Sequence, residues 1–283
     1  MFQFAFGNAI SINTGQQVNY CIDTIPSYDS ARIFDLENAF HIVVPRATPE
    51  DVSNILRAWR SLPSMRRILS RLNNNFLSGP NFLTDKNFYP SSKLTSKIQK
   101  SAYFHGYWQS EDFFISHENI IRNLFQFRGE LSSENQEIIT RIKLGQSIAM
   151  HIRRGDYVTN PKANAMHGVL NADYYFSALA SLRRRVPNAR LFVFTDDPNW
   201  VQTEVVGKME NSECVNINSG GNSFRDMQLM SICEHNIVAN SSFSWWSAWL
   251  NPNPKKIVIA PKKWFYDESI SDKSLIPASW ERM

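Results

Sequence analysis

The chain has 283 residues, a formal net charge of +4 and 43% hydrophobic residues. This composition is typical of a globular protein with one large or two ordinary domains, and it excludes a disordered chain. The excess of basic residues is too small to indicate nucleic-acid binding and is compatible with a small anionic ligand. We therefore expect no nucleic-acid partner.

The cysteines and the hydropathy pattern narrow the cellular setting. Cys21, Cys214 and Cys233 are odd in number and widely spaced, and the chain has no CxxC pair. They favour neither a disulfide framework nor a zinc site, and they indicate a reducing compartment. The sequence has no run of 18 apolar residues and no visible signal peptide, so no membrane span is expected.

The first half of the chain predicts helices and short strands around a long loop. Helices are expected over 1–14, from Thr48 through Trp59, from Ser110 through Phe125, and over 133–142. Strands are expected over 18–22, 41–44 and 101–105. Residues 73–100 predict a loop region with short helices. Gly145 follows the last helix as a C-cap, and we place a domain boundary there.

The second half alternates strands with helices more clearly. Strands are expected over 147–153, 190–195, 215–217, 237–240 and 257–260. Helices are expected over 172–185, from Asp197, over 223–233 and over 241–250. This alternation implies right-handed crossovers and a parallel, Rossmann-like sheet. We therefore predict an α/β protein with domains over 1–145 and 146–283.

Polar residues gather where the predicted strands of the second half end. The tips and the helix before the fourth strand carry Arg153, Arg154, Asp156, Thr195, Asp196, Asp197, Asp226, Asn240, Ser241 and Ser242. In a parallel sheet these positions share one edge, where ligands bind. Guanidinium groups, helix N-terminal amides and acids in one place suit a nucleotide diphosphate.

Several of the candidate residues also have a purely structural explanation. The two arginines could form surface ion pairs, and Asp197 before Pro198 could only cap a helix. Asp226 could be a first-turn acid that the helix dipole favours, and Ser241 and Ser242 could be plain helix caps. His151 could be a core histidine. Trp245, Trp246 and Trp249 are more typical of a core than of a ligand platform.

Several familiar catalytic and binding motifs are missing. The sequence contains no P-loop, GxGxxG, GxSxG or HExxH pattern. It also lacks an Asp-x-Asp pair, and the adjacent Asp196 and Asp197 point their side chains differently on an extended segment. We therefore expect no metal site.

Five stretches resemble the α-1,2-fucosyltransferases of glycosyltransferase family 11. Three correspond to the family motifs, residues 151–157 (HIRRGDY), 194–197 (FTDD) and 240–251 (NSSFSWWSAWLN). Residues 106–110 (GYWQS) and 1–7 (MFQFAFG) also look like the family. The resemblance thus spans nearly the whole chain, and the first and third motifs form a specific pair.

The resemblance implies a GT-B fold, in which two Rossmann-like domains face a cleft and the C-terminal half binds the nucleotide sugar. It further implies GDP-fucose as donor, inversion at the anomeric carbon, and neither cofactor nor metal. The acceptor would be the 2-hydroxyl of a terminal galactoside held against the first domain. The oligomeric state is not implied.

The family also suggests roles for individual residues. By similarity Arg153 and Arg154 hold the diphosphate, and one of the two stabilises the leaving GDP. His151 and Asp226 contact the guanine and the ribose. Further nucleotide contacts are expected from Asp196, Asn240, Ser241, Ser242 and Phe243. We expect Arg154→Ala to abolish transfer without unfolding the protein. Among the acids and histidines offered as catalytic base, Asp156 is favoured over Glu111, Asp112 and His167.

The start of the chain differs from the family pattern. The family has a glycine-rich stretch just before the Met-Phe-Gln with which this chain begins. The first strand and its loop are therefore expected to be missing, and a truncated, non-catalytic binder of GDP-sugar or glycan is the alternative function. The expected location is the bacterial cytoplasm, in lipopolysaccharide or oligosaccharide synthesis. A Golgi-lumenal catalytic domain without its anchor is the alternative.

Overall fold

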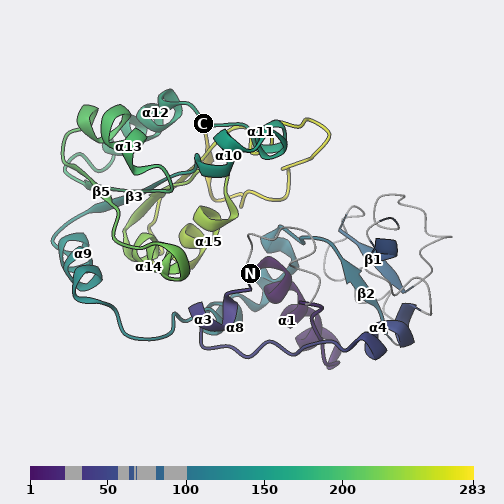
Figure 1. Ribbon diagram of the computed structural model, residues 1–283. Coiled ribbons are helices and arrows are strands. Elements are labelled where there is room, and N and C mark those ends of the chain that lie inside the picture. The colour runs from purple at the N-terminus through teal and green to yellow at the C-terminus, as the bar shows by residue number, and fades with distance from the viewer. Residues whose placement is uncertain (23–33, 57–63, 67, 69–80, 86–100) are drawn as a thin grey trace. The chain divides into compact units, whose positions relative to one another are not determined.

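The computed structural model describes residues 1–22, 34–56, 64–66, 68, 81–85 and 101–283. They form two compact units, residues 1–128 and 129–283 (Figure 1). No helix in these ranges is long and apolar enough to cross a membrane.

The second unit is built on a six-stranded sheet in which every neighbouring pair is parallel. The strand order is β5-β4-β3-β6-β7-β8. The strands are β3 (Ser147–Ile152), β4 (Arg190–Thr195), β5 (Ser212–Val215), β6 (His235–Ile237), β7 (Val258–Ala260) and β8 (Glu281–Arg282). The parallel sheet predicted for this half is confirmed.

Helices cover both faces of this sheet (Figure 1). One face carries α12 (Ala172–Arg183) and α13 (Pro198–Glu204), and the other carries α9 (Ser133–Lys143), α14 (Phe224–Ile232) and α15 (Ser242–Leu250). Two short helices, α10 (Gly155–Thr159) and α11 (Pro161–His167), follow β3. Single 3-10 turns lie at Val206–Lys208 and Gly220–Asn222.

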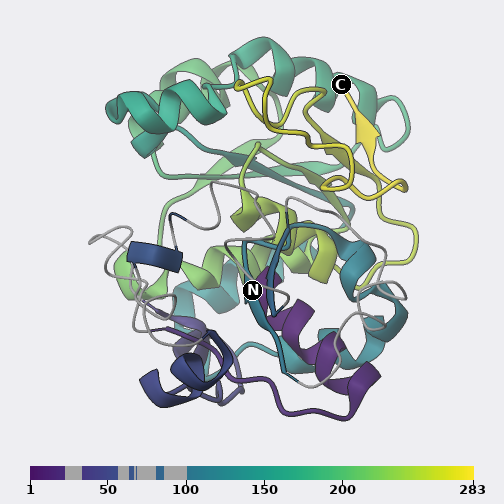
Figure 2. The same cartoon turned by 90° about the vertical axis from the view of Figure 1, so that its right-hand side faces the viewer.

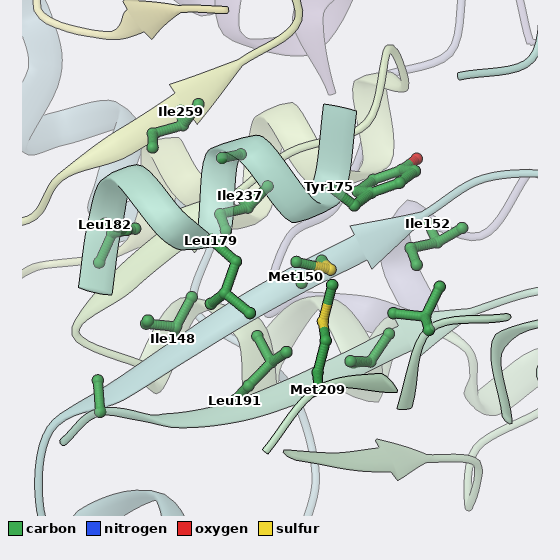
Figure 3. Close-up of a cluster of buried hydrophobic side chains, with 14 of the residues drawn as sticks. Ile148, Met150, Ile152, Tyr175, Leu179, Leu182, Leu191, Met209, Ile237 and Ile259 are labelled. Carbon is green, nitrogen blue, oxygen red and sulfur yellow. The ribbon is translucent and has the colours of Figure 1, made fainter. Parts of the chain in front are cut away.

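Alternation along β3 divides the core between the two faces. Ile148, Met150 and Ile152 pack with α12 and with apolar residues of β4 (Figure 3). Ala149 packs on the opposite face with Phe192 and with residues of α9 and α14. Both faces are covered, so every residue of β3 is buried, as expected for a central strand of a parallel sheet.

The first unit is mainly helical in its described residues. It contains α1 (Phe2–Thr14), α3 (Leu36–Ala39), α4 (Pro49–Leu56), α8 (Glu118–Leu124), and 3-10 turns at Glu111–Phe113 and Ile115–His117. Its two described strands, β1 (Phe82–Thr84) and β2 (Tyr103–His105), pair in parallel. Both are labelled in Figure 1, and Figure 2 gives the view turned by 90°. The Phe6 ring stacks on Trp108 with centroids 4.2 Å apart, which anchors α1 beside the turn after β2.

Some predicted elements of the first half are wrong. Residues 18–22 and 41–44 form no strand, and Tyr20 makes only an isolated bridge to Arg46. Tyr20 instead packs on Phe4, with ring centroids 5.4 Å apart. The helix expected from Ser110 begins only at Glu118, after the two 3-10 turns. Most of the loop predicted over 73–100 lies outside the described residues, but β1 falls within it.

The second half differs in smaller ways. The strands β5 and β6 lie two or three residues closer to the N-terminus than the strands predicted over 215–217 and 237–240. The short elements α10, α11 and β8 were not predicted from the sequence pattern. The predicted boundary at residue 145 assigns α9 to the first half, whereas α9 belongs to the second unit. Ile138 and Ile142 of α9 pack against the sheet there.

Candidate active site

Two arginines and three carboxylates form one network at the carboxyl ends of β3 and β4. Arg153 Nη1 lies 2.9 Å from Asp196 Oδ2, and Arg153 Nη2 lies 2.7 Å from Asp156 Oδ1. The Arg154 backbone N–H donates to Asp196 Oδ1 at 2.8 Å, and Arg154 Nε donates to Asp197 Oδ2 at 3.0 Å. The first two sequence motifs therefore meet, as their places on neighbouring parallel strands predict.

The two arginines occupy different environments. The Arg154 guanidinium lies 4.0 Å from the ring centroid of Trp200 on α13, and only 17% of its side chain is exposed. Stacking and the bond to Asp197 hold Arg154 against the α13 face of the sheet. Arg153 is 34% exposed and lies close enough to His151 to lower its pKa. Successive residues of an extended chain point to opposite faces, which accounts for this difference.

His151 is buried on the α15 side of β3. The residue is 5% exposed, and its ring centroid lies 5.5 Å from that of Phe243. Burial, and secondarily the nearby Arg153, lowers the pKa of His151 to about 3, so the ring is neutral. Among the described residues Nδ1 of His151 has no hydrogen-bond partner. Such an atom requires an explanation, and a bound ligand is one.

Asn240 joins the third motif to the first. Its Nδ2 donates to the backbone oxygens of His167 at 2.7 Å and Trp264 at 3.2 Å, while the Tyr157 hydroxyl donates to the Asn240 backbone oxygen at 3.1 Å. The rings of Tyr157 and His167 stack with centroids 4.7 Å apart. Asn240 is therefore a structural tie between the end of β6 and the α10–α11 segment.

The capping explanations hold for two residues. The Ser241 hydroxyl accepts from the Phe243 backbone N–H and caps α15. Asp197 caps α13 by accepting from the Trp200 backbone N–H, in addition to its bond with Arg154. Ser242 is exposed. The tryptophans of α15 are buried, in agreement with the core role expected for them.

Asp226 lies in the first turn of α14 and is half-buried. Its Oδ1 accepts from Asn218 Nδ2 at 2.7 Å, and Asn218 in turn bonds Asn135 of α9. Burial raises the pKa of Asp226 to about 7, against the opposing effect of Asn218. The two asparagines were not singled out from the sequence, because no spacing pattern connects residues 83 positions apart.

The catalytic-base candidates lie in both units. Asp156 is paired with Arg153, and His167 is stacked on Tyr157. Glu111 and Asp112 belong to a 3-10 turn of the first unit. Throughout the described ranges, no group of three or more His, Cys, Asp or Glu side chains is arranged to hold a metal ion.

Gly155 is required by the close approach of Asp196. A Cβ at this position would collide with Asp196 Oδ2, which binds Arg153. We expect Gly155→Ala to destabilise the protein by about 1–3 kcal/mol, because Asp196 and the start of α10 must move apart, which also breaks the bond from the Arg154 backbone N–H to Asp196. Urea unfolding will measure the loss. Gly145→Ala, where a Cβ has no neighbour within 4 Å, is the matched control, and equal effects of the two changes would contradict this reading.

Lowering the pH is expected to change the contributions of His151 and Asp226 to folding stability in opposite directions. The pKa of His151 falls from 6.5 to about 3 on folding, so its contribution to stability is lost as pH drops below 6.5. The pKa of Asp226 rises from 3.8 to about 7, so its contribution grows as pH falls through 7. Each slope is at most about 1.4 kcal/mol per pH unit.

The His151→Leu variant separates these contributions. As pH falls from about 6.5 to about 4, the free energy of unfolding of the variant is expected to rise steadily relative to that of wild type. Urea unfolding at several pH values measures the difference in free energy of unfolding between the two proteins. A difference that does not change with pH would contradict a buried, neutral histidine.

Comparison with known proteins identifies the family. The model of glycosyl transferase family 11 matches residues 60–282. The chain is 35% identical over 193 residues to an Escherichia coli alpha-1,2-colitosyltransferase, covering 68% of this chain and 66% of that protein. It is 33% identical over 282 residues to the Escherichia coli O-antigen biosynthesis glycosyltransferase WbnK, covering 94% and 91%. Galactoside alpha-(1,2)-fucosyltransferase 1 of Saimiri boliviensis boliviensis is 26% identical over 153 residues, covering 51% and 42%.

Solved structures share the fold. NodZ alpha-1,6-fucosyltransferase soaked with GDP-fucose matches with a TM-score of 0.50 and 17% identity, covering 89% of this chain and 88% of that one. The same enzyme co-crystallised with GDP gives a TM-score of 0.51 and 16% identity with the same coverage. The predicted α/β, GT-B-like fold is thereby confirmed. The family match extends over most of the sequence and includes all three motifs, so the chain belongs to glycosyl transferase family 11.

Proposed function

We propose that the protein transfers L-fucose from GDP-fucose to the 2-hydroxyl of a terminal galactoside, with inversion and without a metal ion. Family membership supports glycosyl transfer, and two relatives are named as α-1,2 transferases. NodZ, which has a similar fold, was solved with GDP and GDP-fucose. The observation that carries the proposal is Arg153 beside the buried His151, whose Nδ1 has no partner in the described ranges.

In this proposal Arg153 holds the diphosphate. Cleavage of the fucose–phosphate bond leaves negative charge on GDP, which a fixed guanidinium stabilises by about 3 kcal/mol or more. Arg153 is the more exposed of the two arginines and shares the α15 face with His151 and Phe243. Its partners Asp156 and Asp196 fix its position in the free protein. A phosphate arriving there can replace part of this pairing.

Arg154 has a supporting role in this account. Its guanidinium is stacked on Trp200 and bonded to Asp197, and its backbone N–H orients Asp196. Through Asp196 it also holds Arg153 in place. Changing Arg154 is therefore expected to affect the stability of the site as well as the rate of transfer.

Asp156 is the proposed base that takes the proton of the acceptor hydroxyl. Its ion pair with Arg153 keeps the carboxylate at the end of β3. The Asp156→Asn variant shows whether Asp156 acts as the catalytic base or only positions Arg153. A base role predicts a loss of kcat with GDP affinity kept, whereas equal losses of both would assign Asp156 to the positioning of Arg153.

A second donor is favoured by one relative. The Escherichia coli protein that is 35% identical is named an alpha-1,2-colitosyltransferase, and colitose is fucose without its 3-hydroxyl. The same diphosphate and guanine contacts would serve GDP-colitose. Turnover of the two GDP-sugars side by side decides between them, since a site that bonds the 3-hydroxyl discriminates strongly against the donor that lacks it.

The acceptor is proposed to be a galactoside of a bacterial surface polysaccharide or its oligosaccharide precursor, modified in the cytoplasm. The name of WbnK, an O-antigen biosynthesis glycosyltransferase, supports this class. The test is turnover of GDP-fucose against a series of β-galactosides, with GDP release and product linkage both measured. GDP-fucose binding without turnover on any acceptor would support the non-catalytic binder instead.

A further inference from the structure

A chain of side-chain amides leads from α9 to the Asp226 carboxylate. Asn135 and Asn218 exchange two hydrogen bonds, with Nδ2 of each donating to Oδ1 of the other at 2.9 and 3.0 Å. The second N–H of Asn218 donates to Asp226 Oδ1 at 2.7 Å. The second N–H of Asn135 donates to the Ser132 hydroxyl at 3.0 Å. Every amide hydrogen of the pair is therefore used, which fixes both amide orientations.

The two asparagines differ in their surroundings, since Asn135 is buried in α9 and Asn218 lies in a loop beside a cavity. Asn135 is 4% exposed and belongs to the first turn of α9, which Ser132 caps. Asn218 lies in the loop between β5 and α14, where a cavity of about 450 Å³ opens beside it. Both asparagines line this cavity and Asp226 does not. Asn218 thus connects the first turn of α9 to the Asp226 carboxylate.

The charge of Asp226 is left without a cationic partner in the described part of the chain. Its neighbour Arg225 is directed elsewhere and donates to Gln228 Oε1 at 2.7 Å and to the Glu130 backbone oxygen at 3.0 Å. Within the same ranges only Asn218 bonds the carboxylate, through Oδ1. Cys214 of β5 also faces Asp226, and burial raises its thiol pKa, so it is neutral at neutral pH. Oδ2 is therefore available to accept N–H or O–H groups of a ligand.

We propose that Asn218, held by Asn135, is a positioning residue that presents the Asp226 carboxylate to a donor group of the bound nucleotide. This inference rests on the proposed function and on the contact between Asp226 and the guanosine part of GDP that the family resemblance implies. A neutral amide suits this task, because an arginine or lysine would neutralise the charge that the ligand needs. The amide stabilises the ionised carboxylate and leaves one oxygen for the nucleotide.

Calorimetry with GDP across a pH series tests the proposal. Ionised Asp226 is the binding form, so the affinity of wild type is expected to fall as pH drops through about 7. Asn218→Asp keeps the shape but removes the donor and adds a like charge, so the midpoint of this fall moves up by about one pH unit or more. Asn218→Ala and Asn135→Ala shift it in the same direction by less.

Asn222→Ala is the matched control, since Asn222 lines the same cavity without bonding Asp226. It is expected to keep the wild-type profile. Melting temperatures of all variants show that they are folded, and NMR titration of the Asp226 carboxyl in the free protein gives a second measure of the shift. An unchanged profile in Asn218→Asp, with GDP binding by wild type intact, overturns the positioning role alone. Failure of wild type to bind GDP at any pH overturns the proposed function as well.

Discussion

Arg153→Ala is expected to lower kcat for fucose transfer by at least about a hundredfold, the loss typical for removal of a group that stabilises transition-state charge. Its affinity for GDP should fall too, because the diphosphate loses a charged hydrogen-bonding partner. Stability should change little, since both Arg153 and its carboxylate partners are partly exposed. Steady-state kinetics, GDP calorimetry and thermal unfolding measure the three quantities.

Two further variants make this prediction specific. Arg141→Ala removes an arginine of similar exposure that pairs with Glu213 at 3.3 Å, and transfer should be unaffected. Arg154→Ala should lower the free energy of unfolding by about 1–3 kcal/mol as the stacking on Trp200 and the partly buried ion pair with Asp197 are lost, with a weaker effect on kcat at low temperature. If Arg154→Ala abolished transfer at an unchanged melting temperature, while Arg153→Ala kept it, the roles of the two arginines would be reversed.

Asp226→Asn is expected to weaken GDP binding by about 10–100-fold at pH 8, the loss of roughly 1.5–3 kcal/mol that a hydrogen bond to a charged group contributes. The variant should also lose the pH dependence of GDP affinity near pH 7, because the raised pKa of Asp226 places the ionisation there. A smaller effect on kcat at saturating donor would show that the contact acts in binding rather than in the chemical step.

The matched control is Asp173→Asn, which removes an exposed acid from the first turn of α12. It should bind GDP like wild type. Equal weakening by both changes would mean that the loss of a first-turn acid, and not a contact with the nucleotide, explains the result.

The central sheet was predictable because its strands carry strong local signals. β3 and β4 are short apolar runs, and each is followed by polar residues at the sheet edge. The strands expected over 18–22 and 41–44 failed for the opposite reason. Residues such as Tyr20 alternate suitably, but a strand needs a partner, and Tyr20 has a single bridge and otherwise packs on Phe4.

The candidate site was predictable as a set of residues but not as an arrangement. Arg153 and Arg154 are adjacent in sequence, but their side chains point to opposite faces of the sheet, and that of Arg154 packs on Trp200 and bonds Asp197. The link from Asn135 to Asp226 could not be predicted, because it depends on α9 and α14 lying side by side. The helix α10 begins at Gly155, where the close approach of Asp196 leaves no room for a side chain. This contact arises only in the folded protein, so α10 could not be predicted from the local sequence.

The most direct test of the central claim is the structure of the product formed from GDP-fucose and a β-galactoside. The proposed reaction releases GDP and gives an NMR-defined product with fucose in α-linkage on the galactose 2-hydroxyl, formed equally well with EDTA present. A β-linked product, attachment at another hydroxyl or dependence on a divalent metal would contradict the proposed reaction. Binding of GDP-fucose without transfer to any galactoside would contradict the claim that this member of glycosyl transferase family 11 is a galactoside α-1,2-fucosyltransferase.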